Sequence, residues 1–322
     1  AELGVSNQGP DQPLFRQSRT ITMHARINEV PGRVRGPRRE VIGLVTFGHP
    51  VRVGCRVRLC GYRDNDDGRS AAMNVFEGRS AVVTGGARGI GAAVVRALAE
   101  SGVRVMVGDV LDEEGERLAE SLGDAVRYRH LDVTEKADWE VLLEEAETMF
   151  GPLAILVNNA GILALGGIDE QSPESFRHIL DVNLYGPWLG MHVAAPLLRR
   201  AGGGVIVNVS STAGLMGYSS LGGYVASKWG LRGLTKAAAL DLSTAGVRVC
   251  SVHPGPIRTP MTAGFGDETA ANQPIPRFGE PEEVAAMVRF IVFEATYSTG
   301  SEFVVDGGAT TGMVLATPAE SD

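Results

Sequence analysis

From Ser80 onward, the sequence alternates short apolar runs with longer segments in which apolar residues recur at helical spacing. The runs at 80–84, 153–157 and 205–209 are apolar at almost every position instead of at every second one. Strands of this composition are buried on both faces, as they are in parallel sheets covered by helices. The alternation therefore predicts an α/β fold of the Rossmann type: a doubly wound parallel sheet of about seven strands, with helices on both faces.

The predicted elements fill one domain, which we place at residues 76–322. Its expected strands lie at 80–84, 103–107, 126–131, 153–157, 205–209, 247–252 and 302–305. Its expected helices lie at 90–100, 112–122, 135–150, 173–200, 222–244 and 281–293. Ligands of such sheets bind outside the carboxyl ends of the strands. The residues that directly follow the strands are therefore the first candidates for a functional site.

Residues 1–75 have a different composition, with 12 arginines against 7 acidic residues and frequent glycine and proline. The stretch 51–59 alternates apolar and basic residues like a strand, but one such strand cannot build a core. We expect a poorly ordered extension. Two alternatives stay open: an arm that binds nucleic acid, and a translation start at Met73.

Charge and cysteine content limit the partners and the compartment. The net charge is −8, and residues 76–322 carry 31 acidic against 18 basic residues, which argues against a nucleic-acid partner. The three cysteines form no even framework, and the sequence has no run of 18 apolar residues and no signal-peptide pattern. We therefore expect a cytoplasmic protein without a membrane span. The histidines at 130, 178 and 192 lack metal-ligand spacing, so no metal is expected.

Tyr224 and Lys228 stand four residues apart at the start of a predicted helix, so they share one face of it. A tyrosine, with a pKa of about 10, is a poor acid-base group at neutral pH. An ammonium fixed roughly 4 Å away would stabilise the phenolate by about 4 kcal/mol at an effective dielectric constant of about 20, which lowers the pKa of the phenol. Only 3 of the 30 basic residues are lysines, which favours a specific need for an ammonium here. The pair is a candidate proton-transfer site.

A glycine-rich turn at 84–91 separates the first predicted strand from the first helix. Glycines let the backbone approach a pyrophosphate, which the helix N-terminus attracts. Asp109 ends the second strand, 20 residues after Gly89, where a carboxylate can bind the adenosine ribose hydroxyls and repel a 2′-phosphate. The pattern therefore predicts NAD as cofactor. Arg88 could pair with a phosphate instead, but a solvated surface charge is the simpler interpretation.

Two further segments follow predicted strands. Asp132-Val133 follows the third strand, where a short acid can hydrogen-bond an adenine amino group, although Asp132 could also cap the next helix. Asn158-Asn159-Ala160-Gly161 follows the fourth strand, where small residues let a cofactor lie across the sheet. Both segments lie at the carboxyl ends of strands, with the glycine-rich turn and Asp109.

Four motifs stand in the order found in the short-chain dehydrogenase/reductase family, which residues 76–312 resemble. They are T-G-x-x-x-G-x-G at 84–91, N-N-A-G at 158–161, Y-x-x-x-K at 224–228 and P-G at 254–255. The resemblance implies an oxidoreductase that uses a nicotinamide cofactor. The cofactor-binding residues that it implies are Gly85, Arg88, Gly89, Ile90, Gly91, Asp109, Asp132, Val133, Asn159, Ala160, Gly161, Tyr224, Lys228, Pro254, Gly255, Ile257 and Thr259.

The resemblance also implies the catalytic roles. Tyr224 exchanges a proton with the substrate oxygen, while Lys228 lowers the pKa of the phenol and holds the nicotinamide ribose. Ser211, 13 residues before the tyrosine, orients the substrate oxygen, and Asn183 in the long predicted helix holds a water. His253 is expected to be structural, because the sequence places no Asp or Ser partner for it.

The segments at 214–217, 227–230, 251–255 and 259–262 resemble those of bacterial 3α,20β-hydroxysteroid dehydrogenases. Residues 261–276 have the composition of a flexible, partly apolar lid, without Lys or Arg between Thr259 and Arg277. Leu215 and Met216 would add apolar surface to the same cavity. We therefore expect a small apolar ketone or alcohol as substrate, specifically a 3α- or 20β-hydroxysteroid.

Two other functions are compatible with parts of the pattern. A 3-oxoacyl-thioester reductase of the same family would ordinarily want NADPH and a basic docking surface, which Asp109 and the acidic domain do not favour. A dinucleotide-binding regulator without turnover would not need the four catalytic residues. The helices around 229–242 and 284–293 carry more apolar surface than one sheet face needs, so we expect a homotetramer.

Overall fold

The computed structural model describes residues 42–46, 52–56, 76 and 78–312. They belong to two units, Ala1–Asp64 and Asn65–Asp322. In the first unit, β1 (Ile42–Thr46) pairs antiparallel with β2 (Arg52–Arg56), which lies inside the stretch where alternation predicted a strand. The expectation of poor order in the extension falls mostly on residues outside the described ones.

The second unit is built on a seven-stranded parallel sheet with the order β5-β4-β3-β6-β7-β8-β9. The continuous apolar runs of β3, β6 and β7 are almost entirely buried, as their composition predicted. The predicted Rossmann-type fold is therefore confirmed. The strands are β3 (Ser80–Thr84), β4 (Arg104–Asp109), β5 (Val126–His130), β6 (Leu153–Asn158), β7 (Gly204–Val209), β8 (Val247–Pro254) and β9 (Glu302–Val305).

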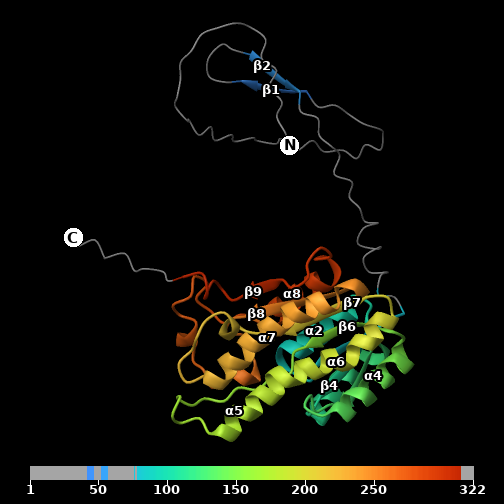
Figure 1. Ribbon diagram of the computed structural model, residues 1–322. Helices are drawn as coiled ribbons and strands as arrows, with labels where there is room; N and C mark the ends of the chain where they lie inside the picture. Colours follow the sequence, from blue (N-terminus) through green and yellow to red (C-terminus); the bar gives the residue numbers. More distant parts are fainter. Residues whose placement is uncertain (1–41, 47–51, 57–75, 77, 313–322) are drawn as a thin grey trace, which may run out of the picture. The chain divides into compact units, whose positions relative to one another are not determined.

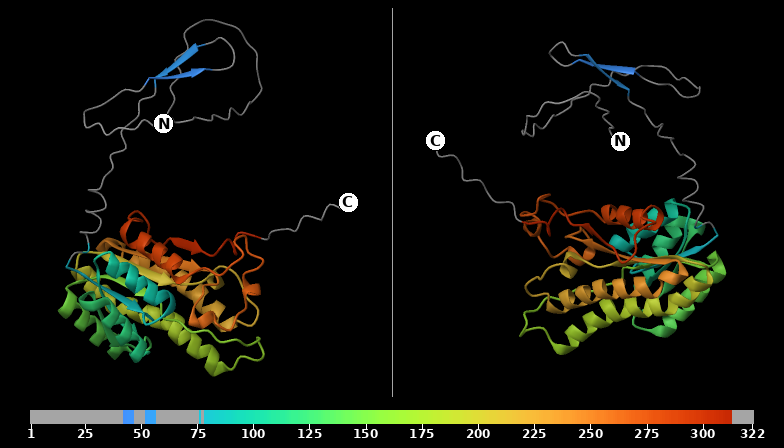
Figure 2. Two further views of the ribbon diagram at one scale, coloured as in Figure 1. Left: turned by 180° about the vertical axis from the view of Figure 1, so that it is seen from behind. Right: turned by 45° about the horizontal axis from the view of Figure 1, so that its top comes forward.

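Helices cover both faces of this sheet (Figures 1 and 2). One apolar cluster joins α2, α3 and α8 to one face, and a second joins α4, α6 and α7 to the other. The right-hand view of Figure 2 shows the sheet between these two helical layers. The helices are α2 (Gly89–Glu100), α3 (Asp112–Leu122), α4 (Lys136–Phe150), α5 (Pro173–Leu180), α6 (Gly186–Arg200), α7 (Gly222–Asp241) and α8 (Pro281–Phe293).

The strand order creates a switch point next to β3. β4 and β5 add to one side of β3, whereas β6 to β9 add to the other side. The connections that leave β3 and β6 therefore run in opposite directions, and ligands of open α/β sheets bind outside the carboxyl edge at such a point. The glycine-rich turn and the segment after β6 both lie at this edge.

Two helices differ from the sequence prediction. The helix predicted at 173–200 is divided, because a π-helical turn, η2 (Asp181–Tyr185), separates α5 from α6. The helix predicted at 222–244 ends at Asp241, and a 3₁₀ turn follows at 243–245. Single π turns inside helices are frequent at functional sites, and this one contains Asn183.

Candidate active site

Tyr224 and Lys228 lie one turn apart near the start of α7, and both side chains are buried. The Lys228 Nζ donates a hydrogen bond to the Val209 carbonyl at the end of β7, at 2.9 Å. The same atom lies 5.5 Å from the centre of the Tyr224 ring. The spacing in the sequence thus places an ammonium beside a phenol, and the strand end fixes its position.

The electrostatics of this pair correct the sequence prediction. Burial raises the pKa of Tyr224, and a hydrogen bond with the Ser211 side chain only opposes this rise. Burial also lowers the pKa of Lys228 to about 8. Desolvation disfavours the charged forms of both groups. Without bound cofactor or substrate, Lys228 therefore does not lower the pKa of Tyr224 below its ordinary value.

Ser211 follows β7 and begins the 3₁₀ turn η3 (Thr212–Gly214). Its backbone is extended, and its Oγ accepts a hydrogen bond from the Ala213 amide at 3.0 Å. Because that bond uses a lone pair, the hydroxyl hydrogen stays free to donate. The structure therefore brings a donor to the phenol of Tyr224, as the sequence resemblance implied.

Asn183 is completely buried in the π turn. Its Oδ1 accepts from the Ile162 amide at 2.8 Å, and its Nδ2 donates to the Ile162 carbonyl at 2.9 Å and to Ser227 Oγ at 3.2 Å. Both amide hydrogens are thus used within the protein. The side chain ties the segment after β6 to α7, and this structure gives it no spare hydrogen with which to hold the expected water.

The glycine-rich turn leaves the backbone bare between β3 and α2. Gly85 and Gly89 have left-handed φ angles of 60° and 56°, which other residues seldom adopt. A Cβ on Gly91 would collide with the Gly85 carbonyl oxygen. The first turn of α2 contains no acidic residue, and no side chain caps it. An uncapped helix N-terminus after a turn of glycines fits the pyrophosphate of a dinucleotide.

Asp109 ends β4, and its carboxylate is buried beside this turn. Oδ2 accepts from the Ala87 amide at 3.0 Å, and Oδ1 accepts from the Leu111 amide at 3.2 Å. The carboxylate therefore braces the glycine-rich turn and also stands at the carboxyl edge of the sheet. Arg88 is exposed, in agreement with a solvated charge.

Thr84 is a residue that the sequence reasoning did not assign to the site. Its Oγ1 accepts from the amides of Asn159 and Ala160 at 3.0 and 3.1 Å. Asn159 Nδ2 donates in return to the carbonyls of Thr84 and Gly85. These bonds join the glycine-rich turn to the end of β6. A hydroxyl that closes a buried apolar strand was the signal that could have identified it.

The remaining predicted cofactor residues lie at the same edge of the sheet. Some of them already make hydrogen bonds within the protein. Asp132 Oδ1 accepts from both the amide and the hydroxyl of Thr134, in a local turn before α4, whose cap position is Glu135 and not Asp132. Gly255 donates to the Val305 carbonyl at 2.9 Å, and Ile257 is buried. Thr259 stands at the cap position of the 3₁₀ turn η5 (Pro260–Thr262). The predicted residues not yet placed are Ile90 at the start of α2, Val133 after β5, Gly161 after β6 and Pro254 at the end of β8.

Comparison with known proteins decides the family. A family model described as enoyl-(acyl carrier protein) reductase matches residues 85–310. The chain is 47% identical over 237 residues to a 3-alpha-(or 20-beta)-hydroxysteroid dehydrogenase of Mycobacterium tuberculosis, covering 73% of this chain and 91% of the relative. It is 42% identical over 243 residues to a cyclohexanol dehydrogenase of an Acinetobacter species, covering 74% and 97%. The chain belongs to the short-chain dehydrogenase/reductase family.

A solved structure supports the same family assignment. A crystal structure of a short-chain type dehydrogenase/reductase from Mycobacterium marinum superimposes with a TM-score of 0.71 at 31% identity, over 74% of this chain and 97% of that one. This short-chain dehydrogenase/reductase is therefore an oxidoreductase acting on alcohols or ketones with a nicotinamide dinucleotide. Family membership leaves the choice of dinucleotide open, since one relative is named an NADP-dependent alcohol dehydrogenase.

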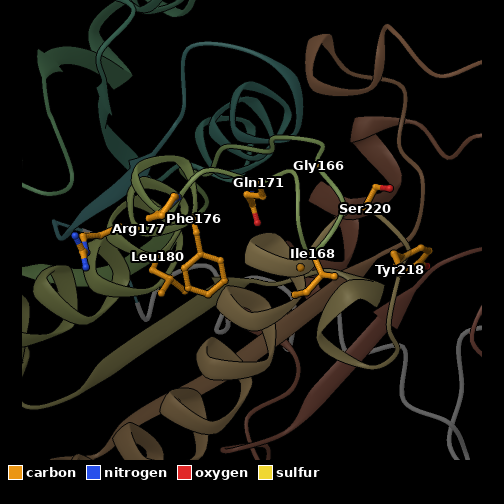
Figure 3. A pocket seen from close by; sticks show the side chains of 11 residues that line it. Gly166, Ile168, Gln171, Phe176, Arg177, Leu180, Tyr218 and Ser220 are labelled. Atoms are coloured by element: carbon orange, nitrogen blue, oxygen red, sulfur yellow. The ribbon is translucent and has the colours of Figure 1, made fainter.

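A hollow of about 620 Å³ opens beside the start of α7 (Figure 3). The segment 166–171, one side of α5 along its whole length and the residues that precede Tyr224 line it. Ile168, Phe176 and Leu180 present apolar side chains to it, whereas the Arg177 guanidinium points away. Tyr218 also lines it and bonds through its hydroxyl to Thr212, next to Ser211.

No helix in the described part of the chain is both long and apolar enough to cross a membrane. No cluster of three or more His, Cys, Asp or Glu side chains within 42–46, 52–56, 76 and 78–312 is arranged to hold a metal ion.

Proposed function

We propose that this short-chain dehydrogenase/reductase oxidises a secondary alcohol, or reduces the corresponding ketone, with NAD(H), and that its substrate is a 3α- or 20β-hydroxysteroid. The observation that carries the proposal is the buried Tyr224–Lys228 pair, which faces Ser211 at the carboxyl edge of the sheet. The dinucleotide would supply the hydride acceptor or donor. A non-catalytic regulator would not need a buried ammonium and a buried phenol, whose desolvation is unfavourable.

The proposed catalytic roles follow from hydrogen-bonding capacity. In oxidation, the substrate hydroxyl gives its proton to Tyr224 while the carbon loses a hydride; in reduction, both transfers are reversed. Ser211 donates its free hydrogen to the substrate oxygen. Lys228 binds the nicotinamide ribose and offsets part of the desolvation of the phenolate. Asn183 keeps the segment at Ile162 against α7.

The pKa of Tyr224 bears on the direction of the reaction. Because burial raises it, the phenol keeps its proton at neutral pH in the protein alone. A protonated phenol can donate to a carbonyl oxygen, whereas oxidation needs the phenolate. We therefore propose that ketone reduction is the favoured direction at neutral pH and that alcohol oxidation increases with pH.

Asp109 supports NAD as the cofactor. Its buried carboxylate already accepts two backbone amides, which fixes its oxygens beside the place where the adenosine ribose would lie. A 2′-phosphate there would lie against these acceptor oxygens instead of a hydrogen-bond donor. The expected result is much higher kcat/KM with NADH than with NADPH. Asp109→Asn should reduce the difference in kcat/KM between NADH and NADPH. It should also lower the free energy of unfolding, because one backbone amide loses its acceptor.

The substrate proposal rests on the apolar surface near Tyr224 and on the relatives. Residues 261–276 include a buried Ala270, and they pack through Ile275 on Gly307. No Lys or Arg lies between Thr259 and Arg277 to bind a carboxylate or phosphate. Relatives named for hydroxysteroids and cyclohexanol act on uncharged ring alcohols. A 3-oxoacyl-thioester reductase is the second candidate, because the matching family model has an acyl-carrier-protein description.

A substrate panel tests the proposal. NADH oxidation is measured with 3-oxo and 20-oxo steroids, cyclohexanone and acetoacetyl thioesters, and each is repeated with NADPH. We expect turnover of the steroids with NADH. Turnover of the thioesters without the steroids would assign the second function, and no turnover of any ketone would favour the regulator.

Compartment, domain limits and assembly are also proposals. We propose a cytoplasmic homotetramer whose catalytic domain spans 76–322. Cys250 is buried and unpaired, which agrees with a reducing compartment.

A further inference from the structure

His253 is a completely buried histidine of β8 that lies against the catalytic turn. Its Nδ1 lies 3.0 Å from the Ser211 carbonyl oxygen, and its Nε2 lies 2.9 Å from Ser251 Oγ. No serine partner was expected for it from the sequence, and the structure corrects this, because Ser251 is two residues earlier on the same face of the strand.

These contacts determine the tautomer. A carbonyl oxygen can only accept, so the Nδ1 must carry a hydrogen. Burial lowers the pKa of His253, which keeps the ring neutral. The Nε2 then accepts from the Ser251 hydroxyl. The charged groups around the ring are Glu302 on β9, together with Arg232 and Lys228 on α7. A second cation next to the Lys228 ammonium would be unfavourable.

The bond from His253 acts on the turn that presents Ser211. The Ser211 carbonyl also accepts from the Gly214 amide at 2.9 Å, within the 3₁₀ turn. His253 is thus the donor that joins this turn to the neighbouring strand. The preceding residue is joined to the same strand, since the Ser210 amide donates to the Val252 carbonyl at 2.8 Å. The peptide of Ser211 is therefore held from β8 on both sides.

We propose that His253, as the neutral Nδ1–H tautomer, is a positioning residue that fixes the direction of the Ser211 hydroxyl toward Tyr224 and the substrate oxygen. The inference rests on the proposed function, because Ser211 must be catalytic for its orientation to affect the rate. Ser211 opposes the rise in the pKa of Tyr224. Loss of its orientation should therefore raise that pKa further in the protein without substrate, and it should remove a donor to the substrate oxygen once substrate is bound.

Two substitutions separate positioning from simple packing. His253→Asn places an amide nitrogen where Nδ1 stands, so it keeps the bond to Ser211. His253→Gln extends further and can reach Ser251 but not the Ser211 carbonyl. Both introduce a buried amide, which makes each the control for the other. Ser251→Ala removes only the distal partner.

We expect these variants to differ in kcat. His253→Asn and Ser251→Ala should lower kcat by less than about threefold, and His253→Gln by about tenfold or more, since a hydrogen bond made in the transition state is lost. The Kd for NADH should not change. The pH at which alcohol oxidation reaches half its maximum should move upward in His253→Gln only. Equal losses in Asn and Gln, or a better Gln variant, would overturn the proposal.

A neutron crystal structure of the unmodified protein tests the tautomer without using activity. We expect a deuterium on Nδ1 of His253 and none on Nε2. A deuterium on Nε2 alone, or on both nitrogens at neutral pH, would overturn the proposal even if no variant folds. If the unmodified protein turns over no alcohol or ketone, the proposed function fails, and the neutron result still decides the state of His253.

Discussion

At the scale of single residues, the site depends on two buried groups whose charged forms are both disfavoured. Burial raises the pKa of Tyr224 and lowers that of Lys228. In the protein without cofactor or substrate, burial therefore favours the neutral form of each group. In the proposed mechanism, cofactor and substrate must supply the interactions that restore charge where it is needed.

Lys228 gives a pH prediction. Its pKa falls from 10.5 to about 8, so the ammonium is present below that pH and is lost as the pH rises through it. If the ammonium holds the nicotinamide ribose, the affinity for NADH should decrease above a pH of about 8. Fluorescence titration of NADH across this range measures it. Lys228→Met serves as control and should bind weakly at every pH. An unmodified protein whose affinity showed no step would contradict the role.

The sequence could predict part of this chemistry. The four-residue spacing of Tyr224 and Lys228 gives their shared helix face, and the structure places them so. The spacing carries no information about burial, which here determines the sign of the pKa shift. Likewise, the bond between His253 and the Ser211 carbonyl joins residues 42 positions apart. No local pattern predicts such a contact.

At the scale of elements, the glycine-rich turn and the π turn shape the proposed site. The turn at 84–91 was predictable, because glycines between a strand and a helix indicate close approach of a ligand. The π turn was not, since one extra residue leaves the composition of a helix unchanged. The π turn directs the Asn183 side chain toward Ile162 and Ser227. A continuous helix would rotate the residues that follow.

A matched pair of glycine substitutions tests the turn. A Cβ at Gly91 would collide with the Gly85 carbonyl, whereas a Cβ at Gly233 in α7 would meet nothing. Gly91→Ala should cost about 1–3 kcal/mol of unfolding free energy by overpacking, and it should weaken NADH binding. Gly233→Ala should stabilise by roughly 0.5–1 kcal/mol, because alanine is the better helix former. Urea unfolding measures both. A neutral Gly91→Ala with normal NADH affinity would show that the turn is not needed in this shape.

At the scale of the whole molecule, the parallel sheet puts the segments that follow β3, β4, β6 and β8 at one edge. Alternation in the sequence predicts a parallel sheet with two helical layers, and this was confirmed. The alternation does not predict the order of the strands within the sheet, because that order depends on which apolar faces pack together. Residues 1–41 are outside the described part of the chain, so the composition of the extension remains the basis for its predicted poor order.

Exposed apolar side chains support the predicted tetramer. Leu240 on α7 is 76% exposed, and Phe290 on α8 is 39% exposed. These helices lie on opposite faces of the sheet, so they offer two separate surfaces. A tetramer with dihedral symmetry needs two different isologous interfaces. Light scattering at micromolar concentration should give a tetramer. Leu240→Glu or Phe290→Glu should give dimers, and the double variant monomers. A monomeric unmodified protein would rule out the assembly.

The central claim is that the Tyr224 hydroxyl carries the proton in a hydride-transfer reaction, and Tyr224→Phe tests it most directly. The substitution removes that hydroxyl and keeps the packing of the ring. Steady-state NADH oxidation with a 20-oxo steroid is measured for both proteins, together with the Kd for NADH. We predict a loss in kcat of about 10²–10⁴-fold, the usual contribution of a general acid, with the Kd nearly unchanged. A variant that kept most of its rate would contradict the account.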